Sequence, residues 1–394
     1  MNIKKVKDYS TEIKGLLSLS NPESVFISSW DKDEHILNIN NDLLFKIAND
    51  YSNVNRYIMS KDMIDVKNEI HNNFITNGVN LNINNFTILS NGTSAAFMSF
   101  LQLMKKGIKK TLVIGPIYFI YKKLSEILNI ELYYWNIDPF QYRININFES
   151  LINELKQNKI KAILLTLPFF GTGVSLGEKS IYKLIEICED NKIHIVIDYI
   201  YENMTWKSNE RIHNYKLIER ILSFDYCIIY ESISKRVFLN GVKNAIIYSN
   251  TKTIEGINSD SEVCLGSISY VQEAFLKYMY DSVNLPIIYR SIEESITHCE
   301  NNYKLLRTLI MDTDALLTYT DRGYFCLMAI PINYFSKRED YDIAIEIIQK
   351  CNVITIPHSR YFYSKKDYYC FRINLTLQTD VIIEAIQKIL HINF

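Results

Sequence analysis

The sequence predicts an α/β protein with a mostly parallel or mixed sheet, covered by helices on both faces and followed by a smaller α+β unit. From residue 86 onward, short apolar segments alternate with amphipathic ones, and this alternation is typical of β–α–β units. It ends near residues 250–262, where the composition becomes polar. The chain has 394 residues, which is enough for a large core and for two domains.

The alternating part is expected to contain seven strands and five helices. Each expected strand is a short apolar run, and each expected helix has hydrophobic residues at helical spacing. The strands are expected at residues 86–90, 111–115, 131–135, 161–167, 193–198, 226–231 and 244–249. The helices are expected near residues 94–106, 117–129, 147–157, 177–190 and 212–222.

The flanking regions predict further elements. Before the alternation, an N-cap followed by helical spacing predicts a helix at 40–49, and a second helix near 62–75 has an apolar face. Long helical patterns follow the alternation. These helices are expected at 263–280, 286–311 and 379–391, with C-terminal strands near 324–330, 353–356 and 369–375.

Charge and cysteine content exclude several classes of protein. A formal net charge of −1 creates no basic field, so neither nucleic acid nor a membrane surface is expected as a partner. No apolar run approaches the roughly 18 residues of a membrane helix, and no signal-peptide core follows the charged N-terminus. Seven scattered cysteines without a Cys-x-x-Cys motif predict a cytoplasmic protein with no disulfide framework or zinc site.

The motif Ser232-Ile233-Ser234-Lys235 follows the strand expected at 226–231. It brings one amine and two hydroxyls to the carboxyl edge of the sheet, where ligands of open α/β sheets bind. An amine held there partly out of water can form a Schiff base with a carbonyl cofactor. The alternative is a solvated surface lysine.

Two further motifs follow the first two strands of the alternation. Asn91-Gly92-Thr93-Ser94 opens a helix; the glycine permits a tight turn, and the amides of Thr93 and Ser94 form an anion site suited to a phosphate. An ordinary helix cap is the alternative. Tyr118 comes after the next strand, where its ring can stack on a flat cofactor or simply pack in the core.

The loop at 167–173 and the strand end at Asp198 come next. Gly171 and Gly173 indicate close approach of the backbone to another group, or a plain turn. Asp198 ends a buried strand, where a carboxylate needs a partner such as a protonated ring nitrogen. It could instead cap a helix.

Two cations complete the set of candidate residues. Lys243, eight residues after Lys235, could give a phosphate a second positive charge or lie on the surface. Arg372 has apolar neighbours on an expected strand. Its planar fork suits a carboxylate, with a structural ion pair as the alternative.

In this order and with this spacing, these residues resemble the fold type I pyridoxal-phosphate enzymes, specifically the aspartate-aminotransferase-like class I/II aminotransferase family. The resemblance covers roughly residues 57–250 well and the C-terminal unit more loosely. It implies a large domain with a mostly parallel seven-stranded sheet and a small α+β domain from the two chain ends. The corresponding division is 1–56 joining the small domain, 57–285 for the large cofactor-binding domain and 286–394 for the small domain.

The resemblance also implies a role for each residue. Lys235 is similar to the family's Schiff-base lysine, Asp198 to the aspartate that pairs with the pyridinium nitrogen, and Tyr201 to the tyrosine that bonds the cofactor's 3′-oxygen. Tyr118 is similar to the stacking aromatic, and Arg372 to the arginine that holds the substrate α-carboxylate. The phosphate ligands implied are Gly92, Thr93, Ser94, Ser232, Lys243 and, across a homodimer boundary, Tyr57.

The sequence departs from the family pattern at three places. Phe170 stands where a family asparagine bonds the 3′-oxygen, and Lys243 stands where the family has an arginine. In place of a Pro-Gly pair the chain has Pro357-His358. His358, Arg360 and Arg322 are candidates to meet an acidic or polar substrate, with surface or structural positions as the alternative.

The predicted function is that of a pyridoxal 5′-phosphate-dependent aminotransferase, moving an amino group between an amino acid and a 2-oxo acid through a Schiff base on Lys235. Because Phe170 alters the surroundings of the 3′-oxygen, the alternative is another reaction on the same cofactor: elimination or replacement, cyclisation or oxidation of an amino acid. A non-catalytic member of the fold is a third hypothesis. The expected assembly is a homodimer with its sites at the subunit boundary.

Overall fold

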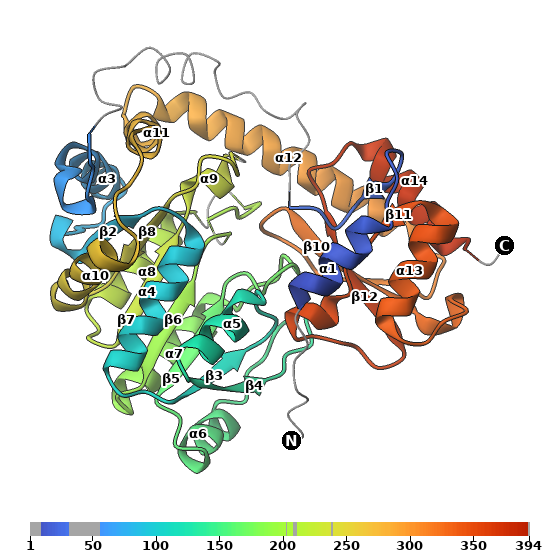
Figure 1. The fold of residues 1–394 in the computed structure, drawn as a ribbon, viewed down its shortest axis with the longest axis horizontal. Coiled ribbons are helices and arrows are strands. Elements are labelled where there is room, and N and C mark those ends of the chain that lie inside the picture. The colour runs from blue at the N-terminus through green and yellow to red at the C-terminus, as the bar shows by residue number, and fades with distance from the viewer. Residues whose placement is uncertain (1–8, 31–55, 202, 208–210, 238, 393–394) are drawn as a thin grey trace.

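The computed structural model describes residues 9–30, 56–201, 203–207, 211–237 and 239–392. The helix expected at 40–49 lies outside these residues. The described residues form a seven-stranded sheet with its helices and a smaller unit at the C-terminal end (Figure 1).

The large sheet has the strand order β2-β8-β7-β6-β5-β3-β4. Strand β8 runs antiparallel to both β2 and β7, and the pairs among the other strands are parallel. All seven predicted strands are confirmed, and no strand end is shifted by more than one residue. They are β2 (Phe86–Leu89), β3 (Lys110–Ile114), β4 (Glu131–Trp135), β5 (Ala162–Thr166), β6 (His194–Asp198), β7 (Cys227–Glu231) and β8 (Ala245–Tyr248).

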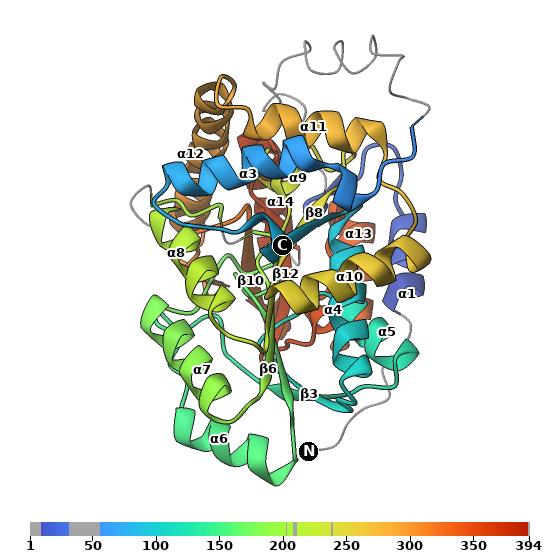
Figure 2. The same cartoon turned by 90° about the vertical axis from the view of Figure 1, so that its left-hand side faces the viewer.

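Helices cover this sheet on both faces, as predicted. Viewed along the sheet in Figure 2, one layer holds α4, α5 and α10 and the other holds α6, α7 and α8. Buried apolar residues on both sides form separate clusters because strand side chains alternate between faces. The bounds are α4 (Gly92–Lys105), α5 (Ile120–Ile127), α6 (Phe148–Gln157), α7 (Glu178–Asp190), α8 (Arg211–Leu222) and α10 (Thr251–Cys264).

The prediction was wrong between residues 250 and 280. A helix was expected at 263–280 after a polar break, but the chain forms α10 (Thr251–Cys264) and then α11 (Tyr270–Tyr280). The polar stretch is helical because Asn250 caps its start, where Oδ1 accepts from the Thr253 amide at 2.9 Å. One face of the resulting helix is also buried. The break falls at Gly266, whose φ is +72°, and Ser269 begins the next helix with a capping box.

The C-terminal unit contains a three-stranded antiparallel sheet in the order β12-β10-β9. The predicted C-terminal strands and last helix are confirmed. The unit consists of β9 (Leu316–Leu317), β10 (Phe325–Pro331), α13 (Asp340–Cys351), β11 (Val353–Ile354), β12 (Tyr368–Asn374) and α14 (Thr379–Leu390).

The N-terminal residues pack against this C-terminal unit, as Figure 1 shows for α1 (Tyr9–Ser18). Strand β1 (Val25–Phe26) pairs in parallel with β11, and the Ile27 carbonyl accepts from the Asn374 amide at 2.7 Å. Helix α12 (Leu285–Leu309) joins the two units: its first half packs in the large core and its second half, from Cys299 on, in the small core.

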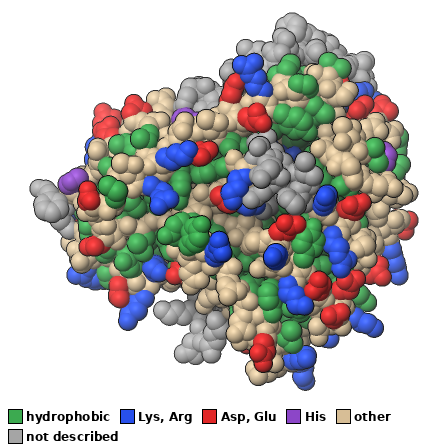
Figure 3. All heavy atoms as spheres, turned by 180° about the vertical axis from the view of Figure 1, so that it is seen from behind, with side chains coloured by type: hydrophobic (Ala, Val, Ile, Leu, Met, Phe, Trp, Pro, Cys, Tyr) green, Lys and Arg blue, Asp and Glu red, His purple; other side chains and the backbone are tan. Residues whose placement is uncertain are grey.

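Three global features accompany this fold. Among the described residues no helix is long and apolar enough to cross a membrane. All seven cysteines are free thiols. On the face shown in Figure 3, acidic and basic side chains are interspersed, in keeping with the net charge of −1.

Candidate active site

A cavity of about 610 Å³ lies where the carboxyl ends of the central strands meet the small unit. Its walls come from the loops after β2, β3, β5, β6 and β7, together with Trp30 from the N-terminal segment. Ten residues singled out in the sequence line it: Gly92, Thr93, Ser94, Tyr118, Phe170, Asp198, Tyr201, Ser232, Lys235 and Lys243. Parallel strands explain this, because their carboxyl ends share one edge.

Lys235 lies in α9 (Ile233–Arg236), a single turn that begins directly after β7. Its Nζ atom donates to Oδ1 of Asn240 at 2.7 Å. Arg236, the last residue of this turn, forms a buried ion pair with Glu231 at the end of β7, and Tyr248 also donates to Glu231. These contacts fix the turn that presents the amine to the cavity.

Asp198 ends β6 and is buried beside the cavity. Its Oδ2 accepts from the Tyr121 hydroxyl at 2.5 Å and its Oδ1 from the Ile200 amide at 3.2 Å. Tyr121 in turn bonds the hydroxyl of Tyr230. Burial raises the pKa of Asp198 to about 6, although both hydrogen bonds act in the opposite direction. A cation facing this carboxylate would therefore relieve an unfavourable burial.

Aromatic side chains, among them Tyr118, Phe170 and Tyr201, border the same space. Tyr118 packs on Phe170 with ring centroids 5.1 Å apart, and burial raises the pKa of its hydroxyl. Burial also raises the pKa of Tyr201 to about 12, and its hydroxyl lies 3.4 Å from that of Tyr324. Both tyrosines thus carry neutral hydroxyls at physiological pH.

Hydroxyl and amide groups gather at the other end of the cavity. The N-terminus of α4 opens there, but Oδ1 of Asn91 already accepts from the Ser94 amide at 2.8 Å. The hydroxyls of Ser232 and Ser234 lie 2.8 Å apart. Nearby, Nδ2 of Asn244 is buried without a hydrogen-bond partner in the described structure. With Lys243, these groups form a cup suited to an anion.

Arg372 is fully buried on β12, behind the cavity wall. Its Nε and Nη2 both donate to the Ser28 carbonyl, at 3.1 and 2.9 Å. Its guanidinium carbon lies 4.4 Å from the Trp30 ring and 5.5 Å from the Phe170 ring. The remaining Nη1 is buried without a hydrogen-bond partner among the described residues, which leaves a charged donor available for a carboxylate.

The other polar candidates do not line this cavity. His358 is buried, and burial together with the Arg372 charge lowers its pKa to about 3, so it is neutral. Arg360 forms ion pairs with Glu12 on α1 and Asp340 on α13. Arg322 bonds Asp321 at a separate groove, and Tyr57 is 86% exposed on the surface.

The glycines of the loop after β5 make the close approach that the sequence indicated, but the approached group belongs to the small unit. At Gly173 (φ +65°) an added Cβ would lie 2.2 Å from Cγ2 of Thr320. At Gly171 (φ +73°) it would lie 2.9 Å from the His358 ring and 3.3 Å from Cδ of Arg372. Glycine therefore lets the two units meet at the site.

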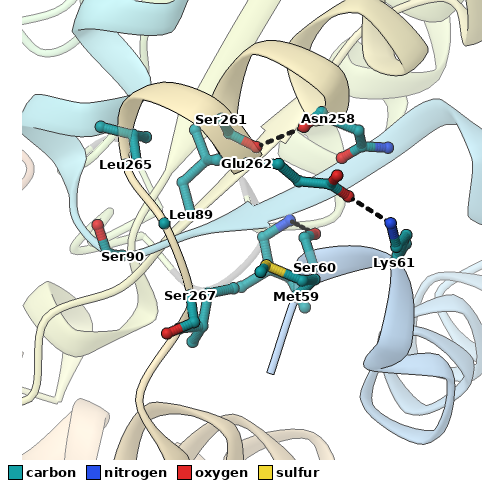
Figure 4. A pocket seen from close by; sticks show the side chains of 13 residues that line it. Met59, Ser60, Lys61, Leu89, Ser90, Asn258, Ser261, Glu262, Leu265 and Ser267 are labelled. Atoms are coloured by element: carbon teal, nitrogen blue, oxygen red, sulfur yellow. Dashed lines mark hydrogen bonds and ion pairs between the residues drawn. The ribbon is translucent and has the colours of Figure 1, made fainter. Parts of the chain in front are cut away.

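A second hollow, shown in Figure 4, lies between the segment at residues 59–61, β2 and α10. Its free volume is about 10 Å³, which holds no more than about one water molecule. Lys61 and Glu262 close it with an ion pair of 2.7 Å. Among the described residues, no cluster of His, Cys, Asp and Glu side chains could hold a metal ion, in this hollow or elsewhere.

Among the cavity residues that the sequence did not mark as candidates are Tyr121, Asn240 and Trp30. Tyr121 looked like one helix residue among others, and Asn240 like part of a surface turn. Trp30 precedes Lys235 by 205 positions in the chain. The one available signal was the position of Tyr121, which is one helical turn after Tyr118 and so lies on the same side of the helix.

The family pattern described as Aminotransferase class I and II matches residues 31–389. The chain is 24% identical to a histidinol-phosphate aminotransferase of Chlorobium limicola, over 41% of this chain and 42% of that protein. It is 26% identical to a tyrosine aminotransferase of Dictyostelium discoideum, over 49% of this chain and 46% of that protein. The chain thus spans about half the length of these curated relatives.

Solved structures resemble the whole fold. The N-succinyldiaminopimelate aminotransferase of Mycobacterium tuberculosis superposes with a TM-score of 0.79, covering 98% of this chain and 97% of that one, at 14% identity. An aspartate aminotransferase of Thermotoga maritima gives 0.77, with 99% and 97% coverage and 12% identity. The predicted fold is therefore confirmed across the chain.

Proposed function

Because the chain belongs to the class I and II aminotransferase family, we propose that it is a pyridoxal 5′-phosphate-dependent aminotransferase. It would move an amino group between an amino acid and a 2-oxo acid. The observation that carries this proposal is the convergence of Lys235, Asp198 and an anion cup on one cavity, with a buried arginine behind its wall. The aminotransferase names of the relatives support it.

The residues around the cavity fit this cofactor. Its aldehyde requires an amine, supplied by Lys235. Its ring nitrogen requires a carboxylate, and Asp198 is a buried one whose pKa is raised by burial to about 6. Its phosphate requires donors, and among the described residues the buried Nδ2 of Asn244 has no hydrogen-bond partner. Ser232 and Lys243 line the same cavity.

Each of these side chains would have a defined role in the reaction. Bound here, the cofactor would supply an electron sink that makes the substrate Cα proton acidic. Lys235 would remove that proton and return it, acting as base and then acid. Asp198 would hold a proton on the ring nitrogen, and Tyr201 would donate to the 3′-oxygen. Nη1 of Arg372 would bind the substrate α-carboxylate.

Tyr118 and Phe170 would shape and dry the site. Tyr118 would lie against the cofactor ring, and Phe170 adds an apolar wall with no hydrogen bond to give. Of the two reaction types weighed, transfer of the amino group is favoured, because the relatives bear aminotransferase names. Elimination, cyclisation and oxidation rest on Phe170 alone.

We also infer a homodimer of cytoplasmic location, with residues 57–285 and 286–394 as its two domains and 1–56 joining the second. Exposed apolar side chains on and beside α10, α11 and α12 support self-association. They are Tyr57, Val263, Val271, Val283 and Ile287. Tyr57 would then reach the phosphate of the neighbouring subunit. Seven free thiols support a reducing compartment.

The absorption spectrum of the purified protein with pyridoxal 5′-phosphate tests this function. We expect a visible band from the lysine-bound cofactor, and conversion to the aminated cofactor when amino acids are added. A 2-oxo acid should then restore the first band. Release of ammonia without an amino acceptor would contradict transamination while keeping the cofactor, and absence of any band would contradict both.

A further inference from the structure

One side chain joins the amine of Lys235 to the N-terminal segment. Oδ1 of Asn240 accepts from Lys235 Nζ at 2.7 Å, and Nδ2 of the same amide donates to the Trp30 carbonyl at 2.9 Å. The two ends of this bridge are 205 positions apart in the sequence. The bridge therefore connects the large domain's reactive group with the N-terminal segment.

The Trp30 end of the bridge lies against the buried arginine. The indole ring lies 4.4 Å from the guanidinium carbon of Arg372, a distance at which the ring face attracts the cation. The Ser28 carbonyl, two residues earlier, accepts both Nε and Nη2 of Arg372. The segment 28–30 thus orients the guanidinium, whose Nη1 has no hydrogen-bond partner within the described part of the chain.

The side-chain amide makes both bonds of this bridge with two different atoms, Oδ1 and Nδ2. A carboxylate of the same shape accepts but cannot donate, and a serine hydroxyl could do both but has a shorter reach. Asn240 sits at the cavity wall beside Lys235, and its side chain is only partly exposed. The Asn240 side chain is therefore better explained as a bridge between Lys235 and Trp30 than as a solvated turn residue.

We propose that Asn240 is a positioning residue that holds the Lys235 amine and, through the Trp30 carbonyl, seats Trp30 over Arg372. This inference rests on the proposed function for its catalytic meaning, since the two linked groups are the proposed base and the proposed carboxylate site. When the amine moves to another partner, the Asn240 amide is left with the Trp30 carbonyl alone. Substrate binding and lysine position are thereby coupled.

Two substitutions separate the two bonds. Asn240→Asp keeps an acceptor for Lys235 but removes the donor to Trp30, whereas Asn240→Ala removes both. In steady-state assays Asn240→Asp should raise KM for the amino acid with a smaller effect on kcat, and Asn240→Ala should change both. Asn191→Ala is a matched control, because Asn191 also donates to a backbone carbonyl, that of Ile187 at 2.8 Å, but is remote from Lys235.

The decisive measurement uses the cofactor-free protein and so does not depend on its activity. Trp30 is one of three tryptophans, and replacing Trp135 and Trp206 by Phe leaves it as the single reporter. Acrylamide quenching of Trp30 should rise about two- to tenfold in both Asn240 variants, the range for loss of one hydrogen bond. The Asn191→Ala control should be unchanged.

Labelling of Lys235 by an amine-reactive reagent, followed by mass spectrometry, reads the other end of the bridge. Relative to the parent protein, labelling should be faster in Asn240→Ala and slower in Asn240→Asp, whose charge holds the amine protonated. Asn240→Ser would replace either variant that failed to fold by circular dichroism. Unchanged Trp30 quenching in folded variants would overturn the proposal, and a missing cofactor band would overturn only the proposed function.

Discussion

The two halves of the site differ in how their polar groups are satisfied. On the large-domain side, Lys235 bonds Asn240 and Asp198 bonds Tyr121. On the small-domain side, buried polar atoms of Trp30, Tyr361 and Arg372 lack hydrogen-bond partners among the described residues. Buried donors without partners are costly. The comparison indicates that the reactive Lys235 and Asp198 of the proposed cofactor half are positioned by the protein itself. In that half, Nδ2 of Asn244 is left for the phosphate, whereas the other half leaves the charged Nη1 of Arg372 for a substrate.

The largest effect is expected from substitution of Lys235, in the half of the site proposed to hold the cofactor. Lys235→Ala should lower kcat by at least about 10³-fold, because the proton-transfer group is lost. Lys235→Arg keeps a positive charge but should be equally inactive, since a guanidinium neither forms the Schiff base nor gives up its proton. A coupled assay of 2-oxo acid formation measures both variants, and substantial turnover by either would refute the assignment of Lys235.

The next largest effect is expected from substitution of Arg372, in the half of the site proposed to bind the substrate. Arg372→Lys should raise KM for the amino acid about tenfold or more, because a planar fork is replaced by a point charge. The same variant should leave the visible band of the bound cofactor in place. Loss of that band, with KM unchanged, would place Arg372 in the cofactor half and reverse the comparison.

The contrast between the halves also explains what the sequence could predict. Residues such as Asp198 and Lys235 directly follow apolar strands, so a local pattern locates them at one edge of the sheet. The surroundings of Arg372 come from Ser28, Phe170 and Tyr361, three segments that no local pattern connects. For the same reason Trp30 and Asn240 were missed, while all seven strands were found.

Other misses have local physical causes. Helix α13 was overlooked although its buried Ile343, Ile347 and Ile348 lie at helical spacing, because acidic residues at its start dominate the composition. Helix α10 was read as a polar break, since its buried residues are few. The buried face of each helix and, for α10, the Asn250 cap decide where the helix lies, more than the average hydrophobicity does.

A smaller effect concerns the stability of the cofactor-free protein. The pKa of Asp198 is raised from its ordinary 3.8 to about 6 by burial, so the folded state binds a proton more tightly than the unfolded chain does. The stability associated with that proton is present below about pH 4 and is lost as pH rises through about 6, at most about 3 kcal/mol.

Asp198→Asn should therefore raise the melting temperature of the cofactor-free protein at pH 8 and change it little at pH 4. Thermal unfolding followed by circular dichroism at both values measures this. With pyridoxal 5′-phosphate bound, the order at pH 8 should reverse, because the parent carboxylate then faces a ring N–H. A variant that is less stable than the parent at pH 8 without cofactor would show that Asp198 is already paired within the protein.

The smallest effect concerns Arg360, a sequence candidate for the substrate that the structure places away from the cavity. Its Nη1 lies 3.4 Å from the Asp340 carboxylate, and it also pairs with Glu12, so it ties α13 to α1. Arg360→Gln should lower the stability by about 1 kcal/mol, since partners left without a cation lose more than an exposed pair would. Chemical denaturation measures this change.

KM and kcat of Arg360→Gln should match those of the parent, in contrast to Arg372→Lys. The comparison of halves requires this difference, because the buried Nη1 of Arg372 has no hydrogen-bond partner in the described structure, whereas Arg360 already pairs with two carboxylates. A rise in KM confined to acidic amino acids would show that Arg360 exchanges Glu12 or Asp340 for a substrate. In that case an arginine that is already paired with carboxylates of the protein would still bind the substrate. A buried donor without a partner would then no longer identify the residues that bind the substrate.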